Sequence, residues 1–157
     1  MKLSEFISKY GDCEVTEEME KFIEKPKGKW MPRYGEEYYY VGDNGYIYDD
    51  KWAGHDNDVY RRYFSRIFKT QEEASRHREI MRACKEASFE PDWEDHDQSK
   101  YHFYYNYGNS NKKLCINPLT FSNSGEPFYF ESYDIARDLI ERFGEKDIAK
   151  YVLGVEV

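Results

Sequence analysis

The sequence lacks the features of membrane-spanning, secreted and disulfide-bonded proteins. No apolar run approaches the roughly 18 residues that a membrane-spanning helix needs, and residues 1–6 do not begin an apolar secretory signal. The 3 cysteines, Cys13, Cys84 and Cys115, have no C-x-x-C spacing. This favours a reducing compartment over a disulfide framework. We therefore expect a protein of the cytoplasm that has no membrane partner.

The sequence also lacks the spacing patterns of common enzymes and metal sites. Its 4 histidines form no H-x-x-x-H or H-E-x-x-H pair, and no serine lies in a G-x-S-x-G motif. The acidic stretches 49–58 and 92–97 miss the glycine and glutamate positions of a calcium loop. An enzyme would have to use His55 or His96, for which no spacing defines a mechanism. We expect no enzymatic activity, no cofactor and no metal site.

Aromatic and charged side chains are abundant. Of the 157 residues, 18% are aromatic and 34% are charged, and the net charge is −8. A chain of this size and composition forms one domain with a hydrophobic core and is too aromatic for disorder. Residues 31–60 contain 7 acids and 2 bases, whereas residues 61–90 contain 8 bases and 5 acids. This charge is ordinary for solubility, but an acidic face would also steer the chain toward a basic partner.

An aromatic hairpin opens the first of two similar units. The expected strands are residues 37–41, 46–49 and 64–68. The Asp43-Asn44-Gly45 segment is a strong hairpin-turn signal because Asn and Gly tolerate positive φ. Thr70, with Glu73 three residues later, makes a capping box that opens a helix. His77 and Cys84 lie on the apolar side of this helix, where packing explains both.

The second unit repeats this plan further along the chain. Its expected strands are residues 101–107, 113–116 and 128–130. Ser132 caps a helix that ends at Gly144. A short helix at 145–151 follows, and residues 152–155 add an edge strand. A duplicated strand-strand-helix unit is typical of a scaffold.

These units predict an α+β fold. We expect one antiparallel sheet, built from two strand-strand-(strand)-helix units and packed against their helices, with an N-terminal helical pair in front. The four segments form one compact domain overall. They are the helical pair, the first unit, an acidic loop and the second unit, at residues 1–25, 26–90, 91–100 and 101–157.

Acidic loops and nearby aromatic side chains are the candidate partner-binding residues. Tyrosine prefers strands and has a polar tip, so a tyrosine-rich sheet is expected to present one wet aromatic face. Aromatic anchors supply affinity in protein interfaces, and charge raises the rate of association. The candidates are Asp43, Asp49, Asp50, Asp56, Asp58, Asp92, Trp93, Glu94, Asp95, Asp97, Tyr46 and Tyr48.

A basic helix face leaves a second interpretation open. Arg78, Arg82 and Lys85 lie on one side of the first unit's helix, and such a stripe can follow a phosphate backbone. Tyrosines would then serve as a stacking platform for single-stranded nucleic acid. The overall negative charge disfavours direct nucleic-acid binding, so protein contact is the preferred interpretation.

Three motifs resemble a recurrent module in small accessory proteins of bacteriophages and prophages of Gram-positive bacteria. They are Trp30-x-Pro32-x-x-Gly35-Glu36-x-Tyr38-Tyr39-Tyr40-Val41, Phe68-x-Thr70-x-Glu72-Glu73-Ala74 and Tyr151-Val152-Leu153-Gly154-Val155. The resemblance spans roughly residues 26–157 and rests on turn and core residues. In general character the chain also resembles anti-CRISPR inhibitors of type II CRISPR nucleases. The resemblance identifies no site residues.

The resemblance implies a phage-encoded, non-enzymatic inhibitor in the cytoplasm of the infected bacterial host. Its partner would be a host defence nuclease, either free or loaded with its guide, and the inhibitor would be a monomer or a homodimer. The alternative is a nucleic-acid-binding phage accessory protein that uses the basic helix and the tyrosine-rich sheet. The Arg-rich helix departs from a pure DNA mimic, which would not need it.

Overall fold

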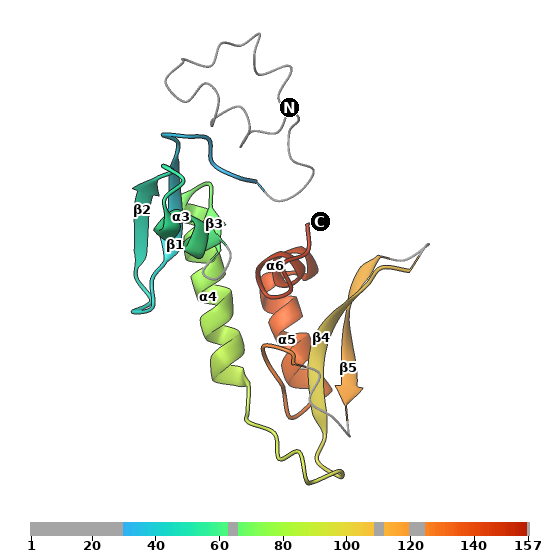
Figure 1. The fold of residues 1–157 in the computed structure, drawn as a ribbon. Helices are drawn as coiled ribbons and strands as arrows, with labels where there is room; N and C mark the ends of the chain where they lie inside the picture. The colour runs from blue at the N-terminus through green and yellow to red at the C-terminus, as the bar shows by residue number, and fades with distance from the viewer. Residues whose placement is uncertain (1–29, 63–65, 109–111, 120–124, 157) are drawn as a thin grey trace. The chain divides into compact units, whose positions relative to one another are not determined.

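A computed structural model describes residues 30–62, 66–108, 112–119 and 125–156 (Figure 1). The chain divides into two units, residues 1–31 and 32–157, and the elements below belong to the second unit. The expected helical pair, residues 1–25, lies outside the described residues. The elements are β1 (Glu37–Val41), β2 (Ile47–Lys51), α3 (Asp56–Tyr60), β3 (Ile67–Phe68), α4 (Gln71–Ala87), β4 (Lys100–Asn106), β5 (Lys113–Leu119), α5 (Tyr133–Phe143) and α6 (Glu145–Tyr151).

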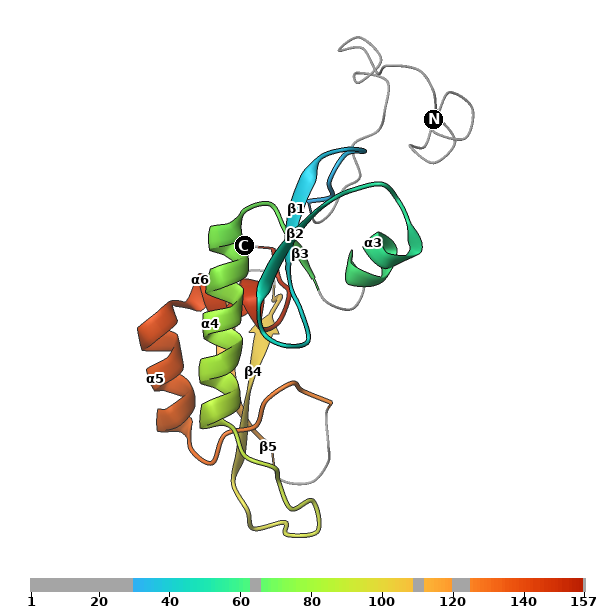
Figure 2. The same ribbon diagram turned by 90° about the vertical axis from the view of Figure 1, so that its left-hand side faces the viewer.

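The α+β class is confirmed, but the described strands form two antiparallel sheets instead of one. The first sheet has the order β2-β1-β3, and the second consists of β4 and β5. The first sheet contacts α4, whereas the second contacts α5 and α6 (Figures 1 and 2). Helices therefore occupy the space through which a continuous sheet would have to run.

The hairpin turn between β1 and β2 forms where the sequence predicts it. Gly42 and Tyr46 close the loop, because the Gly42 N–H donates to the Tyr46 carbonyl at 2.8 Å. Gly45 has a φ of +78°, so the three-residue loop ends in the left-handed region that favours glycine. The register then places Tyr40 opposite Tyr48 and Val41 opposite Ile47.

Helix α4 begins at the predicted cap and buries the predicted side. The Thr70 hydroxyl accepts a hydrogen bond from the Glu73 N–H at 3.2 Å, and the Glu73 carboxylate accepts one from the Lys69 N–H at 3.1 Å. His77 and Cys84 are buried, as expected from packing. Burial raises the pKa of the Cys84 thiol to about 12, so this thiol is not an available nucleophile.

The second strand-strand-helix unit, residues 101–157, matches its predicted helices better than its predicted strands. Ser132 accepts a hydrogen bond from the Ile135 N–H at 3.3 Å and caps α5. The predicted strand at 128–130 is wrong, since only a single bridge joins Phe130 to Tyr101 of β4. Residues 152–155 also form no strand. The Val155 N–H donates to the Ala149 carbonyl of α6 and not to a strand.

One hydrophobic core joins both sheets to the three longer helices. It includes Phe68 of β3, Ile80 of α4, Phe103 of β4, Leu139 of α5 and Ile148 of α6. Both units of the duplicated plan thus contribute to one core, as close packing of half-apolar elements requires. Within the described part of the chain, no helix is long and apolar enough to cross a membrane.

Candidate functional site

The structure divides the predicted acidic residues between the β1–β2 hairpin with α3 and the loop that follows α4. Asp43, Asp49 and Asp56 are exposed on the β1–β2 hairpin and at the start of α3. The acidic loop, defined here as residues 92–98, follows the C-terminal end of α4. The hairpin turn contacts the middle of α4, because Arg78 donates to the Gly45 carbonyl, and roughly 13 Å of helix separates Arg78 from Ala87 at the C-terminal end. The acidic candidates therefore belong to two surfaces.

The two sides of the β1–β2 hairpin differ in their environment. Tyr39, Val41 and Ile47 pack against the core. Side chains alternate along a strand, so Tyr40 and its cross-strand neighbour Tyr48 lie on the opposite side. Tyr46, two residues before Tyr48, shares that side. We call Tyr40, Tyr46 and Tyr48 the tyrosine ladder, and it is the wet aromatic face that the sequence predicts.

Contacts within the fold hold two rings of the tyrosine ladder, those of Tyr40 and Tyr48. The Tyr40 and Tyr48 rings stack with centroids 5.6 Å apart and planes at 28°. Asn44 donates from Nδ2 to the Tyr48 hydroxyl at 2.7 Å and accepts from the Tyr46 N–H at 3.1 Å. Tyr46 and Tyr48 nevertheless remain 67% and 41% exposed. Because the exposed Tyr48 ring is already held, it loses little entropy on binding.

The prediction that Asp58 contacts a partner is wrong, because this residue lies inside the molecule and not on a contact loop. It is 4% exposed, and its carboxylate accepts hydrogen bonds from the Tyr38 hydroxyl at 2.7 Å and from the Ala53 and His55 N–H groups at 3.0 and 3.1 Å. The Asp58 side chain points inward because Asp58, at the third helical position, accepts the hydrogen bond that caps α3. Asp58 therefore attaches α3 to the hairpin.

Arg61 completes this buried network and also restrains Asp50. Its guanidinium donates to the Tyr38 hydroxyl at 2.8 Å and to the Asp50 carboxylate at 2.5 Å, and it lies 4.1 Å from the centre of the Tyr40 ring. Asp50 also accepts from the Lys51 N–H at 2.8 Å. The Asp50 side chain remains 49% exposed, so Arg61 orients it at the surface and its assignment to the partner-binding set stays a prediction.

The network has clear electrostatic consequences. Burial raises the pKa of the Tyr38 hydroxyl to about 12, so this group remains a neutral donor. Burial opposes ionisation of Asp58, but the hydrogen bonds from Tyr38, Ala53 and His55 outweigh it and hold the pKa of Asp58 below its usual value. Asp58 is therefore a carboxylate at neutral pH.

The acidic loop is organised around a buried lysine. Lys100, with 0% exposure, donates from Nζ to the carbonyls of Asp95 and Gln98 at 2.8 and 3.0 Å. Its Nζ lies 5.6 Å from the centre of the Trp93 ring. Trp93 is half-buried, and the other predicted contact residues are exposed on the outside of the loop. They are Asp92, Glu94, Asp95 and Asp97.

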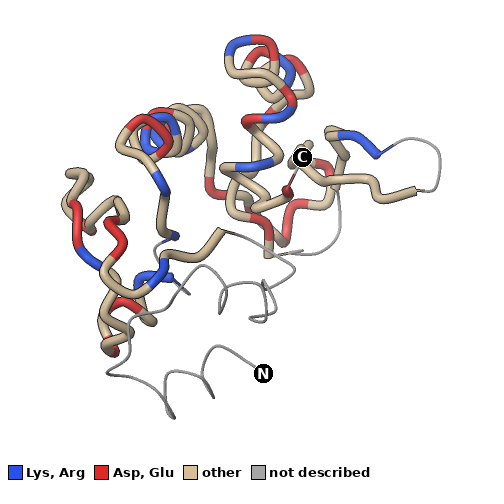
Figure 3. Tube along the Cα trace, turned by 90° about the horizontal axis from the view of Figure 1, so that it is seen from above, with Lys and Arg blue, Asp and Glu red and all other residues tan. Residues whose placement is uncertain are grey.

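The predicted basic stripe of α4 is partly engaged within the fold. Arg78 donates to the Gly45 carbonyl at 3.4 Å, and Lys85 pairs with Glu90 at 3.6 Å. Arg82 is exposed. Acidic positions are interspersed with basic ones along the helices (Figure 3), so the stripe is not a uniformly positive surface.

A second buried polar cluster surrounds His77. Arg66 has a φ of +56°, and its guanidinium donates to the carbonyls of Tyr151 and Val152 at the end of α6. Burial, and next the charge of Arg66, lower the pKa of His77 to about 4. His77 is thus neutral and packed at neutral pH. Among the described residues no group of three or more His, Cys, Asp or Glu is placed to hold a metal ion.

Sequence reasoning missed the residues that hold the two surfaces in place. Tyr38, Arg61 and Lys100 act through partners that their local sequence does not reveal. For Asp58 one local signal exists, an acid three residues after the position that precedes α3. Comparison of the chain with protein families, curated proteins and solved structures finds no match.

Proposed function

We propose that this chain is a non-catalytic binding protein that docks onto a basic protein surface through the tyrosine ladder. The supporting observation is that Tyr46 and Tyr48 are 67% and 41% exposed, and that Asn44 and Tyr40 hold the Tyr48 ring in place while Asn44 also binds the Tyr46 backbone. Exposed, ordered tyrosines are typical anchors of protein interfaces. Asp43 and Asp49 beside them add negative charge that favours a basic partner.

As the partner we propose a host defence nuclease, in the first instance a type II CRISPR nuclease, blocked by a phage-encoded inhibitor. A nucleic-acid-binding enzyme must present a basic groove, and the net charge of −8 suits such a target. The inhibitor acts by occupying the groove and needs no bond-breaking step. The resemblance to phage accessory proteins supports this choice of target.

The test begins with capture of partners from host-cell lysate by the tagged chain, with and without nuclease digestion. Retention of one defence nuclease in both samples, together with inhibition of its DNA cleavage, is the expected result. A Tyr46→Ala, Tyr48→Ala double variant should weaken that binding by roughly 30-fold or more, since paired aromatic anchors each contribute on the order of 1 to 2 kcal/mol.

The matched control is Tyr133→Ala, which removes another tyrosine that is 49% exposed but lies on α5. This variant should bind like the unchanged protein. Equal losses in both variants, or none in the double variant, would contradict the tyrosine ladder as the docking surface.

The alternative function is nucleic-acid binding by Arg78, Arg82 and Lys85. It is favoured by one observation, the exposure of Arg82 and Lys85 on the same helix. A mobility-shift titration with single-stranded DNA at low salt separates the two functions. The inhibitor proposal predicts no shift, whereas the alternative predicts a salt-sensitive shift that Arg82→Gln weakens.

A further inference from the structure

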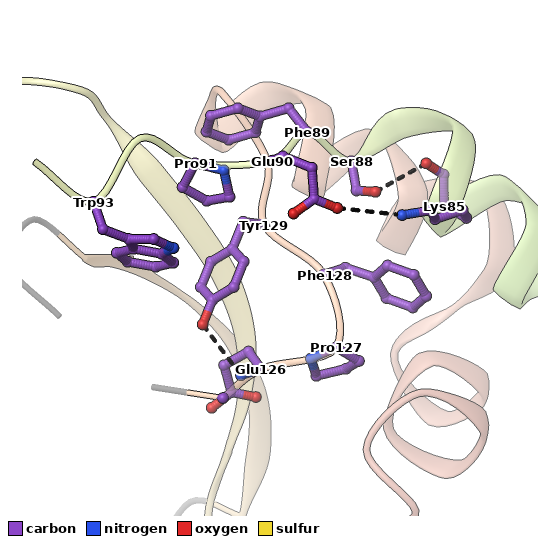
Figure 4. A pocket seen from close by; sticks show the side chains of 11 residues that line it. Lys85, Ser88, Phe89, Glu90, Pro91, Trp93, Glu126, Pro127, Phe128 and Tyr129 are labelled. Atoms are coloured by element: carbon purple, nitrogen blue, oxygen red, sulfur yellow. Dashed lines mark hydrogen bonds and ion pairs between the residues drawn. The ribbon is translucent and has the colours of Figure 1, made fainter. Parts of the chain in front are cut away.

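A half-open hollow lies beside the acidic loop, at the C-terminal end of α4. The segment that follows α4 meets residues 125–129 here, because the Phe89 N–H donates to the Tyr129 carbonyl at 3.0 Å. Figure 4 shows the hollow between Trp93, Tyr129 and Glu90, with Glu126 below. Its volume is about 230 Å³. Since pockets for small molecules are usually about 300 to 1,000 Å³, this one suits a single side chain.

The wall of the hollow is aromatic and rigid. Trp93 and Tyr129 meet edge to face with ring centroids 5.1 Å apart and planes at 79°. The Tyr129 hydroxyl accepts from the Glu126 N–H at 3.2 Å. Trp93 already has the Lys100 ammonium 5.6 Å from its ring centre. A ring pair of this kind attracts cations through its π faces.

The charged side chains that line the hollow are two acids and one base. Glu90 and Glu126 both line it, and Lys85 is the one basic residue among the lining residues. The Glu126 carboxylate lies 3.5 Å from Nδ1 of buried His102. The Glu90 side chain is 93% exposed and contacts Lys85 at 3.6 Å. Such an exposed ion pair is weak, so a cation that binds Glu90 more tightly can displace Lys85.

We propose that this hollow binds an arginine side chain of a basic polypeptide. A guanidinium stacks on aromatic rings and forms paired hydrogen bonds with carboxylates, which an ammonium group cannot do equally well. Trp93 and Tyr129 provide the rings, and Glu90 and Glu126 provide the carboxylates. The acidic loop beside the hollow raises the local concentration of cationic chains.

The arginine comes from the same partner that the tyrosine ladder contacts, and this assignment alone rests on the proposed function. The chain then holds its partner both at the tyrosine ladder and at the hollow. Two linked contacts strengthen binding well beyond either one, provided that the partner spans both. Arginine recognition itself requires no knowledge of the partner.

The experiment is a titration of the ¹⁵N-labelled full-length chain with N-acetylarginine amide, followed by two-dimensional NMR. N-acetylcitrulline amide, which has nearly the same shape and no charge, is the matched probe. We expect saturable shifts of the Trp93 indole and Glu126 amide signals with arginine, and binding roughly tenfold weaker with citrulline. The Glu90→Gln, Glu126→Gln double variant should lose roughly tenfold in affinity, and Lys85→Gln should gain affinity.

The Glu86→Gln variant is the control, since it removes an exposed acid of α4 that does not line the hollow. It should bind arginine as before. Equal binding of the two probes, absence of shifts, or insensitivity to the double variant would overturn the proposal. Shifts produced by a thymidine oligonucleotide instead would assign the hollow to nucleic acid and would overturn it too.

Failure here and failure of the proposed function are distinguishable. The Tyr46→Ala, Tyr48→Ala variant should leave arginine binding unchanged, because these residues are not part of the hollow. If arginine fails to bind but the tyrosine variant still loses its partner, only the hollow is disproved. If arginine binds but no defence nuclease is retained, only the proposed partner is disproved.

Discussion

The hairpin end and the loop end of the protein present aromatic and acidic side chains in opposite ways. At the hairpin end, Tyr46 and Tyr48 project from a strand, and a buried anion, Asp58, holds the supporting structure together. At the loop end, Trp93 and Tyr129 line a hollow, and a buried cation, Lys100, holds the loop. Similar aromatic and acidic composition therefore produces protruding tyrosines at the hairpin end and a hollow that fits one side chain at the loop end.

The largest effect is expected from removal of the buried anion. Asp58→Ala leaves the Tyr38 hydroxyl and two backbone N–H groups without their acceptor, and it removes the carboxylate that lies 3.9 Å from the Arg61 guanidinium. The free energy of unfolding should fall by about 3 kcal/mol, as measured by urea denaturation. Asp56→Ala, an exposed acid of the same helix, should change it by less than about 0.5 kcal/mol. Equal effects would show that Asp58 does not hold the hairpin end.

Removal of the buried cation tests the loop end. Lys100→Met keeps most of the side-chain volume but leaves the Asp95 and Gln98 carbonyls without their donor. We expect a loss of about 2 kcal/mol and faster hydrogen exchange confined to the acidic loop. Lys113→Met, an exposed lysine on the neighbouring strand, should change neither. Uniform acceleration of exchange across the chain would contradict a local role.

The dependence of stability on pH tests the buried His77 in the core between the two ends. The pKa of His77 is about 4 in the folded chain and about 6.5 when unfolded, so between these values the unfolded chain binds more protons. Stability is therefore present above pH 6.5 and falls as the pH drops toward 4. This group should remove about 2 kcal/mol between pH 7 and pH 5.

The matched measurement compares the unchanged chain with His77→Phe across this pH range. The variant keeps an aromatic ring between Phe68 and Tyr151 and removes the proton-binding group. Its stability should fall less steeply between pH 7 and pH 5. Identical slopes would show that His77 is not buried in its neutral form.

The smallest expected effect is a displacement of one ring of the tyrosine ladder. A Cβ at Gly42 would lie 2.7 Å from the Tyr48 ring, so Gly42→Ala must displace this ring from its present position. We expect partner binding to weaken by roughly tenfold, measured by calorimetry with the captured nuclease. Gly108→Ala, in the other hairpin, should bind normally. Unchanged binding by Gly42→Ala would show that the orientation of the Tyr48 ring is unimportant.

Local signals predicted the elements better than their assembly. The Asp43-Asn44-Gly45 turn and the Thr70 and Ser132 caps form as expected, because each depends on a few neighbouring residues. The predicted strand at 128–130 failed, because Phe128 and Phe130 are buried by the core and not by strand pairing. A short apolar run alone does not distinguish these two outcomes.

The candidate site was predicted in its composition but not in its geometry. The exposed tyrosine face of the hairpin follows from alternation along a strand, which the sequence displays. The burial of Asp58 could not be read in the same way, since its partner Tyr38 lies 20 residues away. The hollow was missed entirely because it joins Trp93 to the distant segment 125–129.

The sequence by itself determined the α+β class, the first hairpin turn, the helix caps and the chain's acidic, tyrosine-rich character. These properties depend on composition and on contacts between residues a few positions apart. Only the tertiary structure decided that the strands form two sheets, that Asp58 and Lys100 are buried anchors, and that the acids divide between two surfaces. These outcomes depend on which distant side chains share the limited space of one core, and periodicity along the chain contains no information about that choice.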